Sequence, residues 1–291
     1  METDLANQAL DMRFQSSETP GTTQILLLGS NRMNQSNENV GRSESALPVI
    51  VEGFLEDGKI ASHTSFSDIA AQVFEGRIVV IKGVFEPEML LDFRRQLVSW
   101  WKSNPPFPHG KSPNTAPEIN YHRIDDGVIK SVCPHIFHQF GFNSPNKLAD
   151  EIGQPAQIIA ESMKDLQNKV AGTDFDISLT ELRLKILQYP AGGGFLAEHS
   201  HPLEPQRIGL ITSLSQIGTD FAAGGTFFQT PFGRVDTLAH HDIGDIILFR
   251  YDLPHAVAAV DENQALDWNA DTGKWSVVLE LRETHALSHK V

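Results

Sequence analysis

The segment LRLKILQYPAGGGFLAEHSHPLEPQRIGLITS, residues 182–213, decides the fold of this 291-residue chain. It holds two short apolar runs, at 182–189 and 207–213, which glycine and proline residues separate. Apolar runs of this length between turn residues are typical of strands. Short apolar runs between turn residues continue toward the C-terminus, where we expect strands at 226–230, 234–238, 245–250, 255–260 and 275–283. The last third of the chain is therefore predicted to be mostly β.

Helical spacing precedes these strands. Acidic residues and Pro87 mark a first helical turn, and apolar residues then recur at helical spacing as far as Trp101. A second helix is expected over 146–170, with Pro155 as a break or kink, and 78–81 reads as a buried strand. Two helices followed by about seven or eight short strands favour an α+β chain with a mainly β core. We expect a double-stranded β-helix, or jelly roll, buttressed by N-terminal helices, and not a parallel α/β sheet.

The composition divides the chain near residue 47. Residues 1–47 are rich in Ser, Asn, Gln and Thr and have little apolar periodicity, which predicts a flexible N-terminal tail. From residue 48 onward apolar residues recur densely, and a chain with 40% hydrophobic residues can bury a large core. We therefore expect a single domain at 48–291, with its jelly-roll core at about 180–285.

Charge argues against two classes of partner. The 37 acidic and 23 basic side chains give a formal net charge of −14, which repels nucleic-acid phosphates and anionic lipids. No nucleic acid and no membrane is therefore expected as a partner, whereas a small-molecule substrate is. The single cysteine, Cys133, forms no internal disulfide, and the sequence shows no secretory signal or apolar span of bilayer length. We expect a cytoplasmic protein, and its oligomeric state stays open.

Histidines gather in the predicted β region. His199 and His201 are two residues apart, so on an extended chain they project from the same face. His255 lies 54 residues further on, at the start of another predicted strand, and can complete a three-point metal site. Imidazole ligands suit iron, zinc, copper or nickel, and three protein ligands leave positions open for a substrate or oxygen. The alternative is that these histidines are exposed turn residues or satisfied polar groups.

The order of motifs around this pair extends the argument. The sequence runs YPAGGGF (189–195), HSH (199–201), GGTFF (224–228), GDIILF (244–249), His255 and GKWS (273–276). This order resembles that of the iron(II)/2-oxoglutarate-dependent oxygenases, in outline the prolyl-hydroxylase and phytanoyl-type members. The resemblance covers roughly residues 185–285, and it implies that 48–291 is a single oxygenase-like domain.

The resemblance also implies roles for individual residues. His199 and His255 match the proximal and distal iron-binding histidines. Lys274 and Ser276 lie where the family holds the far carboxylate of 2-oxoglutarate, and Tyr189 is assigned to the same site. The family usually has Arg in place of Lys274, and the 19 residues between positions 255 and 274 exceed its usual gap. Arg282 or Arg250 could therefore bind 2-oxoglutarate instead, and Lys274 could be a solvated lysine at a strand edge.

His201 is the sharpest departure, because the family has an acidic ligand at this position. Three histidines form the direct interpretation of the ligand set, and recruitment of Glu204 is the main rival. An imidazole would fill the space that halogenating members leave for chloride, which disfavours halogenation. Each imidazole must lose its proton to bind a metal, so we expect metal affinity to fall steeply as the pH drops through about 6.5.

Candidates for substrate binding lie outside this cluster. Tyr121, His122 and Arg123 form a polar and aromatic segment that could line a pocket or belong to a surface loop, and Arg250 is a further candidate. His240 and His241 precede a predicted turn, where histidines are usually solvated.

The implied activity is that of a non-haem dioxygenase, an oxidoreductase. Iron(II), 2-oxoglutarate and O2 would hydroxylate, or otherwise oxidise, an unactivated C–H of a small polar metabolite and release succinate and CO2, with ascorbate as a candidate reductant. One alternative is a three-histidine, cupin-like iron dioxygenase that works without 2-oxoglutarate. Another is a jelly-roll ligand-binding module with no turnover, since a fold alone implies no chemistry.

Overall fold

A computed structural model describes residues 46–106, 119–127, 133–142, 152–175 and 182–281. All of them belong to one compact unit, Ser43–Val291, and the other unit, Met1–Arg42, lies outside the described residues. The predicted flexible tail falls outside them except for its last two positions, and so does Arg282.

The described residues form a large antiparallel sheet with three helices. In chain order the strands are β1 (Val49–Glu56), β2 (Lys59–Ser62), β3 (Val79–Lys82), β4 (Ile119–Asp125), β5 (His135–Phe142), β6 (Leu182–Tyr189), β7 (Gly194–His199), β8 (Ile208–Ser213), β9 (Thr226–Thr230), β10 (Gly233–Asp236), β11 (Ile246–Arg250), β12 (His255–Val260) and β13 (Lys274–Leu281). The helices are α1 (Phe66–Phe74), α2 (Pro87–Ser103) and α3 (Gly153–Ala171). All strand pairs are antiparallel except β1 with β3, which are parallel.

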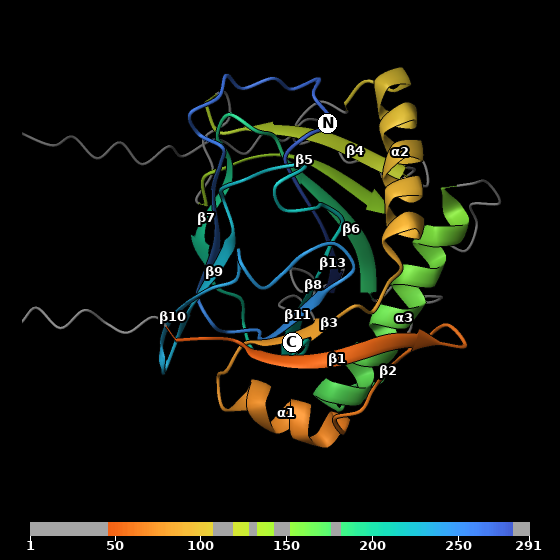
Figure 1. Cartoon of the computed structure of the whole chain (residues 1–291), viewed down its shortest axis with the longest axis vertical. Coiled ribbons are helices and arrows are strands. Elements are labelled where there is room, and N and C mark those ends of the chain that lie inside the picture. Colours follow the sequence, from red (N-terminus) through yellow and green to blue (C-terminus); the bar gives the residue numbers. More distant parts are fainter. Residues whose placement is uncertain (1–45, 107–118, 128–132, 143–151, 176–181, 282–291) are drawn as a thin grey trace, which may run out of the picture. The chain divides into compact units, whose positions relative to one another are not determined.

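The strands form one continuous sheet that curls around an interior. Their order is β10-β9-β12-β7-β5-β6-β13-β8-β11-β3-β1-β2, and β4 pairs with β5 at the side. β5 pairs with both β6 and β7, so it joins the small group β7, β12, β9 and β10 to the larger group that contains β13 and β8. The two groups face each other across the interior (Figure 1). This arrangement is the predicted jelly roll.

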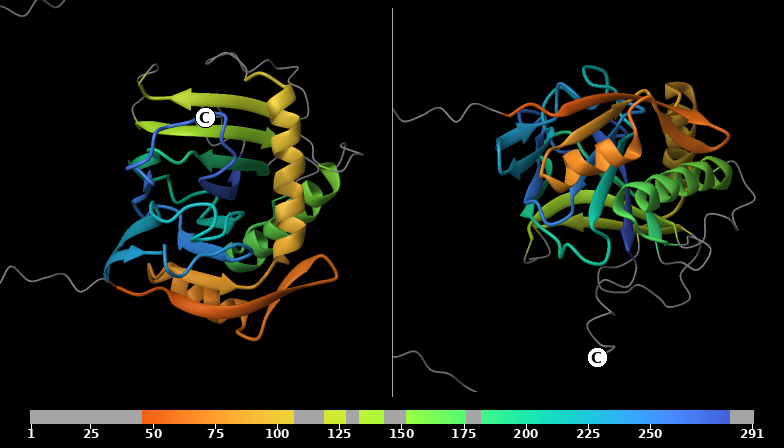
Figure 2. Two further views of the ribbon diagram at one scale, coloured as in Figure 1. Left: turned by 45° about the horizontal axis from the view of Figure 1, so that its top comes forward. Right: turned by 90° about the horizontal axis from the view of Figure 1, so that it is seen from below.

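The helices cover the outside of the larger group of strands. α3 packs against β2, β6, β8 and β13, α2 contacts α3, and α1 lies against β3 and β11 (Figure 2). Successive side chains of β13 point to opposite faces of the sheet, so this strand contributes both to the core beneath the helices and to the interior of the jelly roll. Trp275 and Val277 join the core beneath the helices, whereas Ser276 and Val278 line the interior of the jelly roll. One face of the strand therefore stabilises the fold, and the other is available for chemistry.

One sequence expectation about the helices is wrong. Pro155 does not break or kink α3, because it is the third residue of that helix. The first four N–H groups of a helix have no partner within the helix, so proline is tolerated there. The predicted stretch 146–151 lies outside the described residues. Within the described part of the chain, no helix is long and apolar enough to cross a membrane.

Candidate metal centre

Strand pairing brings the first and the last of the three predicted histidines together. His199 is the last residue of β7, His255 is the first residue of β12, and the two are partners in the antiparallel register. Their ring centroids are 4.3 Å apart. His201 lies two residues beyond the end of β7, with its ring centroid 5.0 Å from that of His199 and 5.4 Å from that of His255. His199 and His255, which are 56 positions apart in the sequence (255 − 199), are thus neighbours in space.

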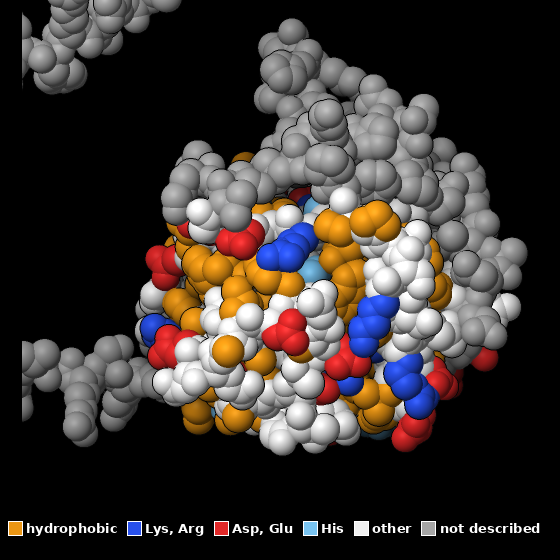
Figure 3. All heavy atoms as spheres, turned by 90° about the horizontal axis from the view of Figure 1, so that it is seen from above, with side chains coloured by type: hydrophobic (Ala, Val, Ile, Leu, Met, Phe, Trp, Pro, Cys, Tyr) orange, Lys and Arg blue, Asp and Glu red, His pale blue; other side chains and the backbone are white. Residues whose placement is uncertain are grey.

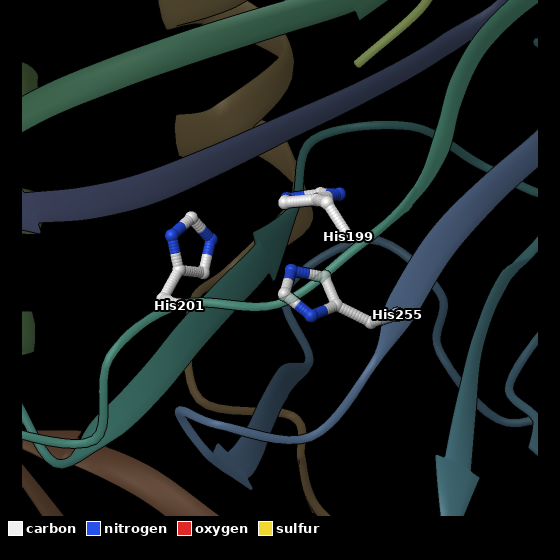
Figure 4. A group of neighbouring side chains, drawn as sticks. All are labelled: His199, His201 and His255. Carbon is white, nitrogen blue, oxygen red and sulfur yellow. The ribbon is translucent and has the colours of Figure 1, made fainter. Parts of the chain in front are cut away.

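The three imidazoles form a cluster that could hold a metal ion. One ring nitrogen from each of His199, His201 and His255 lies within 4.8 Å of the other two. Figure 4 shows the side chains gathered at one place, two from the β7 end and one from β12. Among the described residues, this is the single group of histidine, cysteine and carboxylate side chains with such spacing, and no carboxylate belongs to it.

Backbone hydrogen bonds fix which nitrogen of two rings can bind a metal. His199 Nδ1 lies 3.0 Å from the carbonyl oxygen of Ala197, and His255 Nδ1 lies 2.9 Å from that of Leu253. A carbonyl oxygen only accepts, so each Nδ1 carries the proton and donates it. The lone pair is then on Nε2, the tautomer that a metal requires. The main chain therefore fixes the tautomer of His199 and of His255 that can bind a metal.

The surroundings favour the neutral form of these rings. Burial, together with a smaller contribution from the neighbouring His199, lowers the pKa of His255 to about 3. Burial also lowers the pKa of His199, although its hydrogen bond to Ala197 opposes the shift. Neutral imidazole is the form that coordinates metals, so both rings are ready to bind near neutral pH.

Aromatic side chains pack around the cluster. The ring of Tyr251 stacks on His201, and the ring of Phe249 lies with its centroid 4.7 Å from that of His255. Gly209, opposite Phe249 on β8, makes room for this ring, because a Cβ at position 209 would lie 2.2 Å from its tip. The side chain next to the distal histidine therefore depends on a glycine in the neighbouring strand.

A cavity of about 170 Å³ opens beside the histidines. Residues from both groups of strands line it, and most of them are apolar. The polar and aromatic lining residues outside the cluster are Phe137, Gln139, Lys185, Tyr189, Thr226, Phe249, Tyr251, Ser276 and Glu280. Small-molecule sites commonly combine an apolar wall with a few placed polar groups. The cavity is therefore the candidate binding site.

The predicted 2-oxoglutarate residues lie together on neighbouring strands. Lys274 begins β13 and pairs with Tyr189, the last residue of β6, and Ser276 follows on the same face of β13. The hydroxyl oxygens of Ser276 and Thr226 are buried without a hydrogen-bond partner. Buried polar atoms without partners are uncommon and point to a missing ligand or water.

Lys274 is a buried cation. It is 2% exposed, so it is not the solvated strand-edge lysine of the alternative interpretation. Its ammonium nitrogen lies 5.5 Å from the centroid of the Phe221 ring, and no described residue forms a hydrogen bond or an ion pair with it. Burial lowers the pKa of Lys274 to about 8, partly offset by the charge of Asp236. An unpaired buried ammonium is costly, and a bound anion would remove that cost.

Other candidates from the sequence lie elsewhere. The Glu204 carboxylate, the main rival for the third ligand, is 69% exposed and pairs with Arg207 at 3.4 Å, outside the cluster. Arg250 pairs with Asp252 at 2.6 Å and donates to the carbonyl of Phe74, and it is not among the residues that line the cavity. His241 is wrongly predicted as a solvated turn residue, because it is 2% exposed and its Nε2 donates to the carbonyl of Asp245.

The segment around residue 121 belongs to a different hollow. Tyr121 and Arg123 lie on one face of β4 and line a second pocket of about 330 Å³ together with His138 and Trp268. His122 lies between them and is not part of this lining. Figure 3 shows the molecule from the end at which β4 lies, and hydrophobic, basic and histidine side chains lie side by side on that surface. The structure does not bring these residues into the histidine cavity.

Sequence reasoning missed one charged group of the cavity. Lys185 on β6 and Glu280 on β13 both line the cavity and form an ion pair at 2.5 Å, and Arg183 adds a second contact to Glu280 at 2.9 Å. Alternation along β6 could have placed Lys185 on the same face as Tyr189, which is the signal available in the sequence.

Fold and site together describe a double-stranded β-helix protein with a candidate metal centre in its interior. No family model and no curated protein sequence matches the chain. Among solved structures, a candidate oxygenase from Shewanella oneidensis aligns with a TM-score of 0.51 at 12% identity, over 81% of this chain and 90% of that one. This similarity confirms the predicted fold.

Two further solved structures align less closely. A prolyl-4-hydroxylase from Pseudomonas putida gives a TM-score of 0.49 at 10% identity, over 75% of this chain and 98% of that one. A prolyl hydroxylase from Trichoplax adhaerens, solved with a hypoxia-inducible factor peptide, gives 0.48 at 13% identity, over 76% and 90% of the two chains.

Proposed function

We propose that the protein is a non-haem iron(II) and 2-oxoglutarate-dependent oxygenase that oxidises a C–H bond of a small polar molecule. One observation carries the proposal. A three-imidazole cluster opens onto a cavity with two unpaired buried hydroxyls, those of Ser276 and Thr226, and the buried, unpaired Lys274 begins the strand that carries Ser276. Fold similarity to a candidate oxygenase is consistent with this function but implies no chemistry by itself.

The residues present fit both groups that the activity requires. His199 and His255 offer Nε2 lone pairs that their backbone hydrogen bonds preset, and His201 supplies the third imidazole. Imidazole is a ligand that iron accepts, and three protein ligands leave open positions on the metal. Lys274 and Ser276 can donate to one carboxylate, and a charge-assisted contact of this kind is among the stronger hydrogen bonds. The unpaired state of both groups supports this assignment.

Iron(II) and 2-oxoglutarate, when bound with O2, supply the oxidation, with succinate and CO2 as the products of the co-substrate. The chain itself holds and orients the groups that bind them. The main-chain carbonyls of Ala197 and Leu253 keep two imidazoles in the ligating tautomer, and Tyr251 keeps His201 in place by stacking. Apolar side chains such as Leu187, Val257 and Val278 keep much of the cavity wall dry, which strengthens the electrostatic contacts inside it.

The test is oxygen consumption and succinate release by the full chain with iron(II), with and without 2-oxoglutarate. We expect oxygen uptake that requires both, and its loss in His199→Ala and His255→Ala. Oxygen uptake that does not depend on 2-oxoglutarate would contradict the proposal, and so would purified protein that binds no iron.

The ligand set favours a second candidate as well. A third histidine replaces the carboxylate that the resembled family uses, and no carboxylate joins the cluster among the described residues. A three-histidine iron dioxygenase whose substrate chelates the metal directly fits that set. Succinate separates the two functions, because this second activity would consume oxygen without forming it.

A further inference from the structure

The wall of the histidine cavity contains a cation, Lys185, that the proposed function leaves without a role. Lys185 lines the cavity on β6 opposite Val278, whereas Lys274 pairs with Tyr189 at the other end of the same two strands. Val278 lies four positions beyond Lys274, which is about 13 Å along a strand. The proposed function assigns 2-oxoglutarate to Lys274 and the metal centre, and it assigns no ligand to Lys185.

The charges around Lys185 do not cancel. Glu280 accepts contacts from Lys185 at 2.5 Å and from Arg183 at 2.9 Å, both through the same carboxylate oxygen Oε2. Two cations and one carboxylate leave a net positive charge on this part of β6 and β13, of which Lys185 and Glu280 line the cavity. Among the described residues, Glu280 is the only ion-pair or hydrogen-bond partner of the Lys185 ammonium, which has three hydrogens to donate. The ammonium can therefore accommodate a further acceptor.

A purely structural role explains the cluster poorly. Arg183 already pairs with Glu280, and Lys185 with Val278, through the backbone ladder between β6 and β13, so the ion pairs are not needed to set the register. The side chain of Lys185 is 14% exposed, and the lining around it includes Leu210, Val278 and Leu279. Placing charges in such surroundings carries a desolvation penalty that an ion pair often fails to recover.

The pair lines the same cavity as the histidines. Lys185 and Glu280 share this lining with His199, His201 and His255, and also with Tyr251, which stacks on His201. A molecule in contact with Lys185 would therefore lie in the cavity onto which the metal centre opens.

We propose that the Lys185 ammonium, oriented by Glu280, binds a carboxylate of the substrate, so that the molecule oxidised is a small organic acid. The inference rests on the proposed function, since it assigns one group of the substrate of that site. Lys274 then binds the co-substrate, and Lys185 binds the substrate.

The experiment measures binding without turnover. The full chain is loaded with Mn(II) and saturating 2-oxoglutarate under nitrogen, and calorimetry follows the titration of butanoate, hexanoate and phenylacetate and of their amides. We expect the acids to bind roughly tenfold or more tightly than the matched amides, because the amides lack the charge that a charge-assisted contact requires. Lys185→Met should abolish this preference, and Lys185→Arg should retain part of it.

Matched variants separate this site from others. Lys169→Met removes a lysine of α3 that pairs with Asp165 at 2.7 Å, and it should leave the preference unchanged. Lys274→Met should weaken 2-oxoglutarate binding and keep the preference for acids.

Two results would overturn the inference. One is wild-type protein that binds acids no more tightly than amides, a comparison that needs no variant to fold. The other is Lys185→Met with the full preference. Failure of the proposed function looks different, because it would appear as missing 2-oxoglutarate-dependent oxygen uptake while acid binding still depends on Lys185.

Discussion

The ring of His201 lies flat against the ring of Tyr251, with centroids 4.3 Å apart and planes inclined by 10°. His201 lies beyond the end of β7, so strand pairing does not hold it as it holds His199 and His255. Stacking against Tyr251 holds the ring of His201 in place instead. Tyr251 is itself buried, at the turn that follows β11.

Replacing Tyr251 should therefore loosen the metal centre. Aromatic pairs contribute about 0.5 to 1.5 kcal/mol beyond burial, so Tyr251→Leu should weaken Mn(II) binding roughly 2- to 13-fold. Tyr251→Phe keeps the ring and should bind the metal as the wild type does. Equal affinities for the leucine and phenylalanine variants would show that stacking does not position His201.

His201 itself should be indispensable. His201→Ala should lower the iron stoichiometry and abolish succinate release, because two imidazoles remain. His201→Asp restores a two-histidine, one-carboxylate set and should retain some activity. His240→Ala, at a half-buried position outside the cluster, should change neither property. Full iron loading and near-normal turnover in His201→Ala would exclude His201 as a ligand.

Lys274 should control the affinity for 2-oxoglutarate. A lost charge-assisted contact costs about 1.5 to 3 kcal/mol, so Lys274→Ala should raise the apparent requirement for 2-oxoglutarate roughly 10- to 150-fold while iron stays bound. Arg250→Ala serves as the control, because Arg250 is already paired with Asp252 and donates to the carbonyl of Phe74. If Arg250→Ala or Arg282→Ala alone weakens 2-oxoglutarate binding, the assignment to Lys274 is wrong.

The same lysine predicts a pH dependence. Burial lowers the pKa of Lys274 to about 8, and only the protonated form attracts a carboxylate. The dissociation constant of 2-oxoglutarate should therefore stay flat below pH 7 and rise as the pH passes above 8. Lys274→Arg should remove this rise, because the guanidinium stays charged throughout. Calorimetry between pH 6.5 and about 9.5 measures both profiles.

Metal binding should depend on pH less steeply than three ordinary imidazoles would require. Burial lowers the pKa of both His199 and His255, so protons compete for these rings only at more acidic pH than usual. This revises the steep fall through pH 6.5 that the sequence suggests. The logarithm of Mn(II) affinity should change by at most about one per pH unit between 5.5 and 6.5, and a slope near three would contradict the prediction.

The N-terminal segment should be dispensable for folding. Residues 1–45 lack the periodic apolar residues that would offset the entropy of ordering them. A chain that starts at Ala46 keeps the main-chain contact from its nitrogen to the carbonyl of Arg234 and should melt within a few degrees of the full chain. A truncated chain that fails to fold would show that the segment packs on the domain.

Much of the jelly roll could be predicted because its strands are locally encoded. β6, β9 and β12 begin and end where the apolar runs do, at 182–189, 226–230 and 255–260. The sequence analysis does not predict β1 and β2, although the dipeptide Asp57-Gly58 is a preferred hairpin turn and is a signal for this pair. Both residues have positive φ in the structure, as such a turn requires. The helix α1 was also missed, and its signal is the side chain of Ser65, which caps the first turn.

The Lys185–Glu280 pair could not be predicted in the same way. The two residues are 95 positions apart (280 − 185), and no local periodicity links them. Their contact follows from the register between β6 and β13, which depends on the whole fold. The histidine cluster could be anticipated because two of its members are two residues apart on one chain.

The connection between β12 and β13 has a consequence for how such chains change over time. His255 and Lys274 belong to different strands, and the 13-residue connection 261–273 between those strands contributes neither group. Length can be gained or lost in this connection while β12 stays paired with β7 and β13 stays paired with β6. The interval between the two residues along the chain is thus free to drift, whereas their cross-strand partners are constrained. Distant homologues of this protein should share its pairings more faithfully than its spacings.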